Sequence, residues 1–285
     1  MKRFNQFIAA ALVLVILGAG CRKEDELNTN GLEQLGGDRW PATEVDKWIL
    51  DTLTTPYNIA VTYRWNAFEL DLDKTLVPPD IEKVVPMMRI VKKGWIDVYR
   101  DEISDNFIKL FCPKQYSLVG SVAYNTNGTV KLGEAESGRK VTLYRVNQLN
   151  IKDSVFVKRV LKTIQHEFVH ILQQNVVPPV EYGTITPSGY TSDWAAVSDV
   201  NARAAGFITP YAMAEPREDM AEMIAIMLTE GEGGYEKIVT AQTAATQALF
   251  RKKEQAIVNY LKQNFNINLY SLRNRARLHL LQILN

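Results

Sequence analysis

Two of the chain's three histidines stand four residues apart, in the run His166-Glu167-Phe168-Val169-His170. In a helix, residues at this spacing lie on one face about one turn apart, so both imidazoles can bind one zinc ion. In zinc hydrolysis, a carboxylate such as Glu167 takes a proton from zinc-bound water and passes it to the leaving group. The spacing therefore predicts a zinc hydrolase with His166 and His170 as ligands and Glu167 as general base.

Two histidines at this spacing could also be packed in the core or exposed to solvent, and the helical face on which they lie helps to decide between these alternatives. Apolar residues recur at helical spacing between positions 157 and 172, and at 100° per residue both histidines lie on the opposite side. This placement argues against a pair of histidines packed in the core. Two solvated histidines on an outer face remain an alternative, but Glu167 beside His166 favours metal binding.

A catalytic zinc usually has three protein ligands and one open position. The remaining histidine, His279, lies far along the chain in an apolar run, and we expect it to pack on a helix. The segment 216–222 is a better source, because Pro216 suits the first turn of a helix and Glu218 and Glu222 share one face. A solvated acidic face would also explain this pair, but the upstream histidines favour zinc ligation by one of the two glutamates.

An H-E-x-x-H helix followed some tens of residues later by a helix reading E-D-x-A-E resembles the gluzincin-type metallopeptidases. The resemblance implies that Glu218 is the third ligand and that Glu222 orients a ligating histidine without touching the metal. Some relatives have a tyrosine seven residues before the glutamate ligand, where it supports the oxyanion, and Tyr211 stands at that place. The metzincin pattern needs a third histidine six residues after His170, and Val176 at that position excludes it.

The N-terminus predicts an export signal. A short basic start precedes an uncharged apolar run at 7–20, which is too short to span a membrane and fits the h-region of a signal peptide. Small residues lead to Cys21, as in bacterial lipoproteins, although position 18 is a glycine where a large aliphatic residue is usual. We therefore expect residues 1–20 to be a lipoprotein signal peptide and Cys21 to be lipidated. An ordinary secretory signal or an uncut anchor is the alternative.

Residues 21–40 are rich in charge and glycine, so they predict a flexible tether. The acidic cluster just after Cys21 resembles the surface-export signal of some bacterial outer-membrane lipoproteins. Together with the histidine motif and the Glu218–Glu222 helix, this N-terminus resembles the substrate import-associated zinc metallohydrolase lipoproteins, also described as zinc-binding metallopeptidases. The resemblance implies one zinc ion, a lipid anchor in the outer membrane, exposure at the cell surface and association with an outer-membrane nutrient-import system.

Residues 41–285 predict one domain of the α+β class, with strands in the half up to about residue 175 and helices after it. We expect a zincin-like metallopeptidase fold: a small mixed or antiparallel sheet beside the active-site helix, followed by a mostly helical C-terminal part. The expected strands are 58–65, 115–124, 129–132 and 140–146, with Asn127-Gly128 as a hairpin turn. The expected helices are 44–53, 80–99 with Pro86 breaking or kinking it, 154–175, 193–205, 216–230, 235–264 and a last one to 284.

Composition excludes several other classes of protein. The chain has 33 Lys and Arg against 32 Asp and Glu, a net charge of +1, which argues against nucleic-acid binding. Two cysteines exclude a disulfide framework, and we expect Cys112 to be a small buried residue. No G-x-S-x-G, P-loop or G-x-G-x-x-G motif is present.

Three functions fit these features. The first is a surface-tethered zinc metallopeptidase that hydrolyses peptide bonds of a peptide or protein, held by an edge strand at about 141–146. The second is a non-catalytic accessory or binding lipoprotein of an import complex, in which zinc is structural. The third is a zinc hydrolase that acts on a non-peptide amide or ester, which the motif cannot separate from the first.

Overall fold

The structure is a computed structural model that describes residues 41–66, 70, 74–124, 128, 130, 131, 133–136 and 139–285. The expected signal peptide, Cys21, the tether and Asn127 lie outside these residues. Residues Ala42–Asn285 form one compact unit. In the described part of the chain, none of the helices combines the length and the apolar character that a membrane-spanning segment requires.

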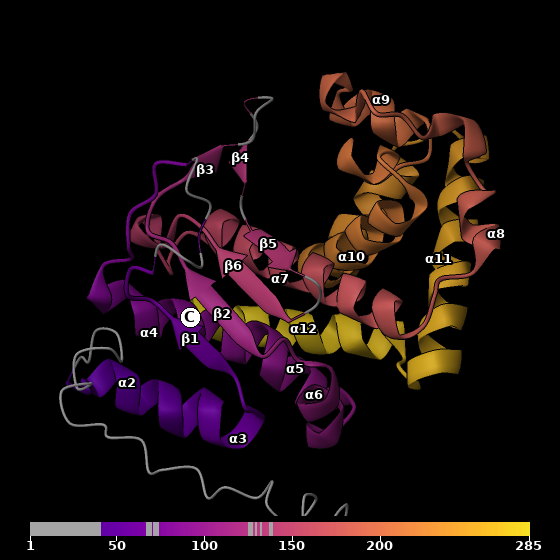
Figure 1. Cartoon of the computed structure of the whole chain (residues 1–285). Helices are drawn as coiled ribbons and strands as arrows, with labels where there is room; N and C mark the ends of the chain where they lie inside the picture. Colours follow the sequence, from indigo (N-terminus) through magenta and orange to yellow (C-terminus); the bar gives the residue numbers. More distant parts are fainter. Residues whose placement is uncertain are drawn as a thin grey trace, which may run out of the picture. The chain divides into compact units, whose positions relative to one another are not determined.

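All described strands precede residue 144, and the described elements after it are helical (Figure 1). The strands are β1 (Ala60–Thr62), β2 (Gln115–Leu118), β3 (Ala123–Tyr124), β4 (Val130–Lys131), β5 (Gly133–Glu136) and β6 (Lys140–Leu143). The α-helices are α2 (Glu44–Ile49), α3 (Thr55–Tyr57), α4 (Ile81–Val91), α5 (Asp97–Glu102), α6 (Asp105–Phe111), α7 (Ser154–Asn175), α8 (Val180–Gly183), α9 (Asp199–Ala204), α10 (Pro216–Thr240), α11 (Ala244–Phe265) and α12 (Leu269–Leu284). The predicted α+β class is confirmed.

The main sheet has the strand order β1-β2-β6-β5. Strands β1, β2 and β6 run parallel, and β5 runs antiparallel to β6, so the sheet is mixed. The expected edge strand at 141–146 is wrong, because β6 pairs with β2 on one side and β5 on the other. Among the described strands, β1 and β5 lie at the edges. Strands β3 and β4 form a separate antiparallel pair, and Gly128 between them has a φ of 80°.

Helix α7 begins and ends where local signals place it. The side chain of Asp153 accepts hydrogen bonds from the backbone N–H groups of Val155 and Phe156, which caps the N-terminus. Two prolines follow Val177 and prevent the helix from continuing. The predicted helix 154–175 is confirmed with the same bounds.

An aromatic cluster fixes the buried side of α7 against the first half of the chain. The ring of Phe168 packs edge-on against Trp95, with centroids 5.0 Å apart, and against Tyr99 at 4.8 Å. The hydroxyl group of Tyr99 also donates a hydrogen bond to Gln165 at 2.8 Å. Because Phe168 lies between the two motif histidines in sequence but points the other way, this anchor turns His166 and His170 toward the second half of the chain.

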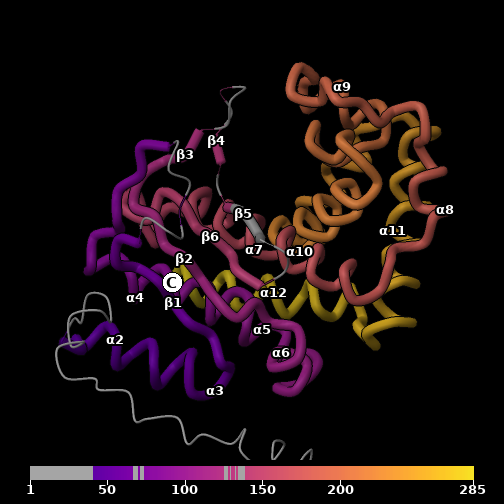
Figure 2. Tube along the Cα trace, viewed as in Figure 1, coloured from indigo at the N-terminus to yellow at the C-terminus, as the bar shows by residue number. Residues whose placement is uncertain are grey.

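Strand β5 passes directly over α7. A Cβ atom on Gly133 would lie 2.3 Å from the Cγ2 atom of Thr163, so only glycine permits this close approach. Thr163 is one turn before the histidine motif. The edge strand β5 therefore lies beside the helix that carries His166 and His170, as Figure 2 also shows.

Helices α7 and α10 pack along each other, and α12 packs on α10 and returns to α5 (Figure 1). The single helix expected at 235–264 is wrong. The backbone of α10 leaves helical geometry at Gly231, which has a φ of 69°, so the expected helix 216–230 is confirmed and a further helical segment runs on to Thr240. Helix α11 begins at Ala244, where the side chain of Thr243 accepts a hydrogen bond from the Thr246 N–H. The expected helix at 80–99 consists of α4, a π-helical segment (Lys92–Ile96) and α5, and α4 continues through Pro86.

Candidate metal centre

The structure brings the side chains of His166, His170 and Glu218 together between α7 and α10. The two Nε2 atoms lie 3.0 Å apart. Oε2 of Glu218 lies 3.0 Å from Nε2 of His166 and 3.2 Å from Nε2 of His170. These are the described histidine and carboxylate groups whose ligand atoms cluster closely enough to hold one ion.

The spacing of these three atoms suits zinc. Donor atoms that are about 2.0–2.1 Å from one zinc ion in tetrahedral geometry lie about 3.3 Å from one another. The observed distances of 3.0 and 3.2 Å are close to that edge length. Two imidazoles and one carboxylate are also a ligand set that catalytic zinc takes. The residues present therefore fit a zinc ion.

Glu222 occupies a different place from Glu218, on the far side of the His166 ring. Its carboxylate oxygen lies 2.9 Å from Nδ1 of His166, although the N–H direction is not well aligned with it. The hydroxyl group of Thr209 donates to the same carboxylate at 2.6 Å and accepts a hydrogen bond from the Ala212 N–H. Glu222 therefore contacts the ring nitrogen that a metal at Nε2 does not use.

Gln173 has the matching position beside His170 and was not predicted from the sequence. Its Oε1 lies 2.9 Å from Nδ1 of His170, and its Nε2 donates to the backbone carbonyl of Arg217 at 3.0 Å. Because the amide nitrogen is used on Arg217, the amide oxygen accepts from the His170 Nδ1–H and leaves Nε2 to face the cluster. The signal was local: Gln173 is three residues after His170 on the same helix, within reach of its ring.

Proton affinities at the cluster follow from its carboxylates. Burial alone would lower the pKa of His166, but the contacts with Glu218 and Glu222 outweigh it and raise the pKa to about 9. Burial is likewise outweighed at His170, where Glu218 raises the pKa. Against the effect of burial, the histidines lower the pKa of Glu218, and His166 and Lys162 lower that of Glu222 to about 2. A cation at this cluster would therefore displace protons from the imidazoles.

Glu167 and Tyr211 lie beside the cluster. The charge of Glu167 contributes to the raised pKa of both His166 and Tyr211, which places it near the two side chains. The Tyr211 ring stacks on His166 with centroids 5.7 Å apart and packs against Trp194 at 4.8 Å. Burial, followed by the charge of Glu218, raises the pKa of Tyr211, so its phenol is protonated at neutral pH.

His279 lies outside the cluster, and the two motif histidines are not solvent-exposed. His279 lies on α12 and pairs with Asp101 at 3.2 Å, away from the cluster, as expected for a packed histidine. Two solvated histidines are excluded, because His166 is only 6% exposed. The face opposite the apolar stripe is covered by α10, whose carboxylates take the place of water.

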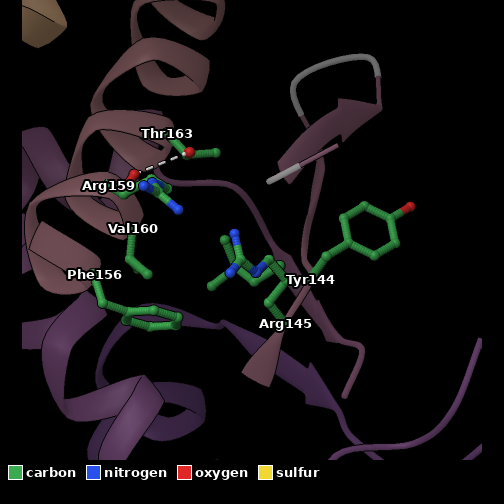
Figure 3. A pocket seen from close by; sticks show the side chains of 7 residues that line it. Tyr144, Arg145, Phe156, Arg159, Val160 and Thr163 are labelled. Carbon is green, nitrogen blue, oxygen red and sulfur yellow. Dashed lines mark hydrogen bonds between the residues drawn. The ribbon is translucent and has the colours of Figure 1, made fainter. Parts of the chain in front are cut away.

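A small pocket lies next to the N-terminal half of α7. Arg145, two residues after the end of β6, and Arg159, on α7, point into it, and Phe156 and Thr163 complete its wall (Figure 3). Its volume of about 10 Å³ holds at most one water molecule. This pocket is therefore too small for a substrate.

An α+β fold in which an H-E-x-x-H helix faces a glutamate from a second helix is the arrangement of a zinc metallopeptidase. Residues 38–270 match the family described as "putative zinc-binding metallo-peptidase". A crystal structure with the same description, from Bacteroides caccae, is similar at 32% identity and a TM-score of 0.73, over 86% of this chain and 96% of that chain. No curated protein matches the chain. The chain therefore belongs to this zinc-binding metallopeptidase family, and the resemblance drawn from its motifs is confirmed.

Proposed function

We propose that this protein is a zinc-dependent hydrolase that cleaves peptide bonds, with one zinc ion held by His166, His170 and Glu218. The observation that supports it most is the convergence of Nε2 of His166, Nε2 of His170 and Oε2 of Glu218 within 3.0–3.2 Å. Glu167 is next to His166 on α7. Within the described residues the cluster has three ligands, and three protein ligands with one open position favour a catalytic over a structural zinc.

The side chains around the cluster have separate tasks in this proposal. Bound zinc supplies Lewis-acid chemistry, which acidifies water and polarises the scissile carbonyl group. Glu167 accepts the proton of the attacking water and passes it to the leaving amine. The protonated phenol of Tyr211 donates a hydrogen bond to the carbonyl oxygen as negative charge develops on it. Glu222 and Gln173 keep the two imidazole rings in orientation through their Nδ1 atoms.

The sheet supplies a place for an extended substrate. Strand β5 is an edge strand among those described, and it crosses α7 one turn before the motif. A peptide that pairs with its backbone groups would run alongside the candidate metal centre. We therefore assign to β5 the role in substrate binding that was expected of residues 141–146.

We also propose that Cys21 carries a lipid and anchors the protein in the outer membrane of a bacterium, exposed at the cell surface. The support is the apolar run that ends at Cys21 and the acidic cluster that follows it. Association with an outer-membrane nutrient-import system follows from the family resemblance. Metabolic labelling with a fatty acid, compared between the natural chain and Cys21→Ser, tests the anchor; equal labelling would contradict it.

Glu167→Gln is the most direct test of the hydrolase. The amide cannot accept the proton of water, so hydrolysis of a quenched-fluorescence peptide library is expected to fall by about 100- to 10,000-fold. Zinc content is expected to stay the same, because Glu167 is not a ligand. Glu181→Gln, an exposed glutamate on α8, is the matched control and is expected to retain activity. Full activity in Glu167→Gln would contradict the mechanism.

The accessory-protein alternative makes the opposite prediction. A zinc-loaded natural chain would then hydrolyse no member of the peptide library, and Glu167→Gln would change nothing. A library of non-peptide amides and esters, run in parallel, separates the third function from the first.

A further inference from the structure

Lys253 and Asp219 form an ion pair in the interior of the helical half. Nζ of Lys253, on α11, lies 2.6 Å from Oδ2 of Asp219, on the first turn of α10, and their side chains are 0% and 1% exposed. Nζ also donates to the backbone carbonyl of Gly206 at 2.9 Å and lies 3.8 Å from the centre of the Phe207 ring. Lysine is almost never buried so completely unless it is paired.

Stability alone is a poor explanation for this pair. Removing two charges from water is costly, and well-packed apolar residues in place of a buried ion pair are often equally or more stable. A buried pair does specify how the elements that carry it fit together. The pair joins α11 to α10. Tyr190, in the segment that connects α7 to α10, donates a hydrogen bond of 3.0 Å to the same Oδ2 atom of Asp219.

Asp219 directly follows the candidate ligand Glu218. Successive residues of a helix point about 100° apart, so Asp219 faces α11 while Glu218 faces the histidines of α7. A rotation or shift of α10 that separated Asp219 from Lys253 would also move Glu218 from its positions 3.0 and 3.2 Å from the two imidazoles. Ligand distances in metal sites lie within about 0.2 Å of their usual values, so such a movement would disturb the site.

We propose that Lys253 is a positioning residue of the metal centre: through Asp219 it fixes the first turn of α10 and holds Glu218 where it meets the two histidines. The role rests on the proposed zinc site. It extends that site to α11, a helix that carries none of the candidate ligands.

Lys253→Met tests the proposal, because methionine fills much of the space without the charge. In the purified full-length chain, zinc affinity measured by competition with a chromophoric chelator is expected to fall at least about tenfold. The visible spectrum of the cobalt-substituted chain is expected to change, because its bands depend on ligand geometry. An unchanged affinity and spectrum in the folded variant would overturn the proposal.

Glu254→Gln is the matched control on the same helix. Glu254 follows Lys253, is also buried, and accepts hydrogen bonds from Tyr235 at 3.2 Å and Tyr270 at 3.1 Å. Its replacement is expected to lower the unfolding temperature and to leave zinc affinity and the cobalt spectrum unchanged. If it weakened zinc binding as much as Lys253→Met, general destabilisation would explain both results and the proposal would fail.

The double variant Lys253→Met with Asp219→Leu separates positioning from stability. It leaves no unpaired buried charge, so stability is expected to recover while zinc binding stays weak. Recovery of both stability and zinc affinity in the double variant would overturn the proposal. If Lys253→Met alone does not fold, the double variant takes its place in the zinc measurements. The natural chain, measured alongside, distinguishes failure of the proposed zinc site from failure of the role of Lys253. If the natural chain binds no zinc, the zinc site itself is overturned. If the natural chain and all variants bind zinc equally well, only the role of Lys253 is overturned.

Discussion

Lys162 and Glu222 form an ion pair between α7 and α10, with Nζ 2.6 Å from Oε1 of the carboxylate. Lys162 is one turn before His166 on α7. The carboxylate of Glu222, which contacts Nδ1 of His166, is therefore held in place by a lysine on the same helix as that histidine. Glu222 is 1% exposed, and a buried carboxylate needs such partners to remain ionised. Glu218 and Glu222 are thus not interchangeable: one faces Nε2 of the histidine and the other faces Nδ1.

The separate places of the two glutamates predict unequal effects on zinc binding. Glu222→Gln keeps the shape but loses the charge beside His166, and zinc affinity is expected to weaken by about 10- to 100-fold without being abolished. Glu230→Gln is the matched control, because Glu230 makes the same kind of pair with Lys158 between the same two helices, at 2.6 Å. Chelator competition measures both variants, and equal losses would contradict the role of Glu222.

Gln173→Leu tests the support of His170. Leucine cannot accept the Nδ1–H hydrogen bond or donate to Arg217, so zinc affinity is expected to fall by roughly tenfold. The neighbouring Gln174 is exposed, and Gln174→Leu on the same helix is expected to bind zinc like the natural chain. A Gln173→Leu variant with unchanged affinity would show that the ring of His170 needs no such partner.

Tyr211→Phe tests support of the oxyanion. The ring remains to stack on His166, but the hydroxyl group that would donate to the developing charge is lost. The turnover number is expected to fall by roughly 100-fold, with zinc affinity unchanged. Steady-state kinetics on a cleaved library peptide, together with zinc titration, checks both parts. A change in KM alone would instead assign Tyr211 to substrate binding.

Asp46 predicts a pH dependence of stability far from the metal centre. The guanidinium of Arg64, at 2.8 and 2.9 Å, and the Thr43 cap lower the pKa of Asp46, although burial opposes them. Because the folded pKa lies below the unfolded value of about 3.9, the stabilisation is full at neutral pH and is lost as the pH falls below about 4. Asp46→Asn is expected to lower the free energy of unfolding by about 1 kcal/mol at pH 7.

Urea unfolding of both chains from pH 7 down to pH 3 checks this sign. The difference between the natural chain and Asp46→Asn is expected to shrink as the pH is lowered, because the amide side chain of the variant does not titrate. A difference that stays constant or grows toward low pH would contradict the assignment.

Local signals account for what the sequence predicted well. Helix α7 could be placed to the residue because its cap at Asp153, its apolar periodicity and the prolines after Val177 are all within or next to the helix. The histidine motif lies on this helix, so the relation of His166 to His170 followed from helix geometry alone.

The rest depends on contacts between distant segments. Gln173 meets Arg217, and Lys253 meets Asp219, only because α10 packs in one register between α7 and α11. Strand β5 reads Gly-Glu-Ala-Glu and has no large apolar or β-branched residue to reveal it, and it forms by pairing with β6. The burial of His166 could not be predicted from the apolar periodicity of α7, because the groups that cover this face of the helix are carboxylates of α10.

Metal analysis of the purified full-length chain tests the central claim most directly. After zinc loading and extensive dialysis, the natural chain is expected to keep about one zinc ion per molecule. Glu218→Ala is expected to lose nearly all of it, because it removes a ligand atom 3.0 Å from Nε2 of His166. No retained zinc in the natural chain, or full retention in Glu218→Ala, would contradict the site formed by His166, His170 and Glu218.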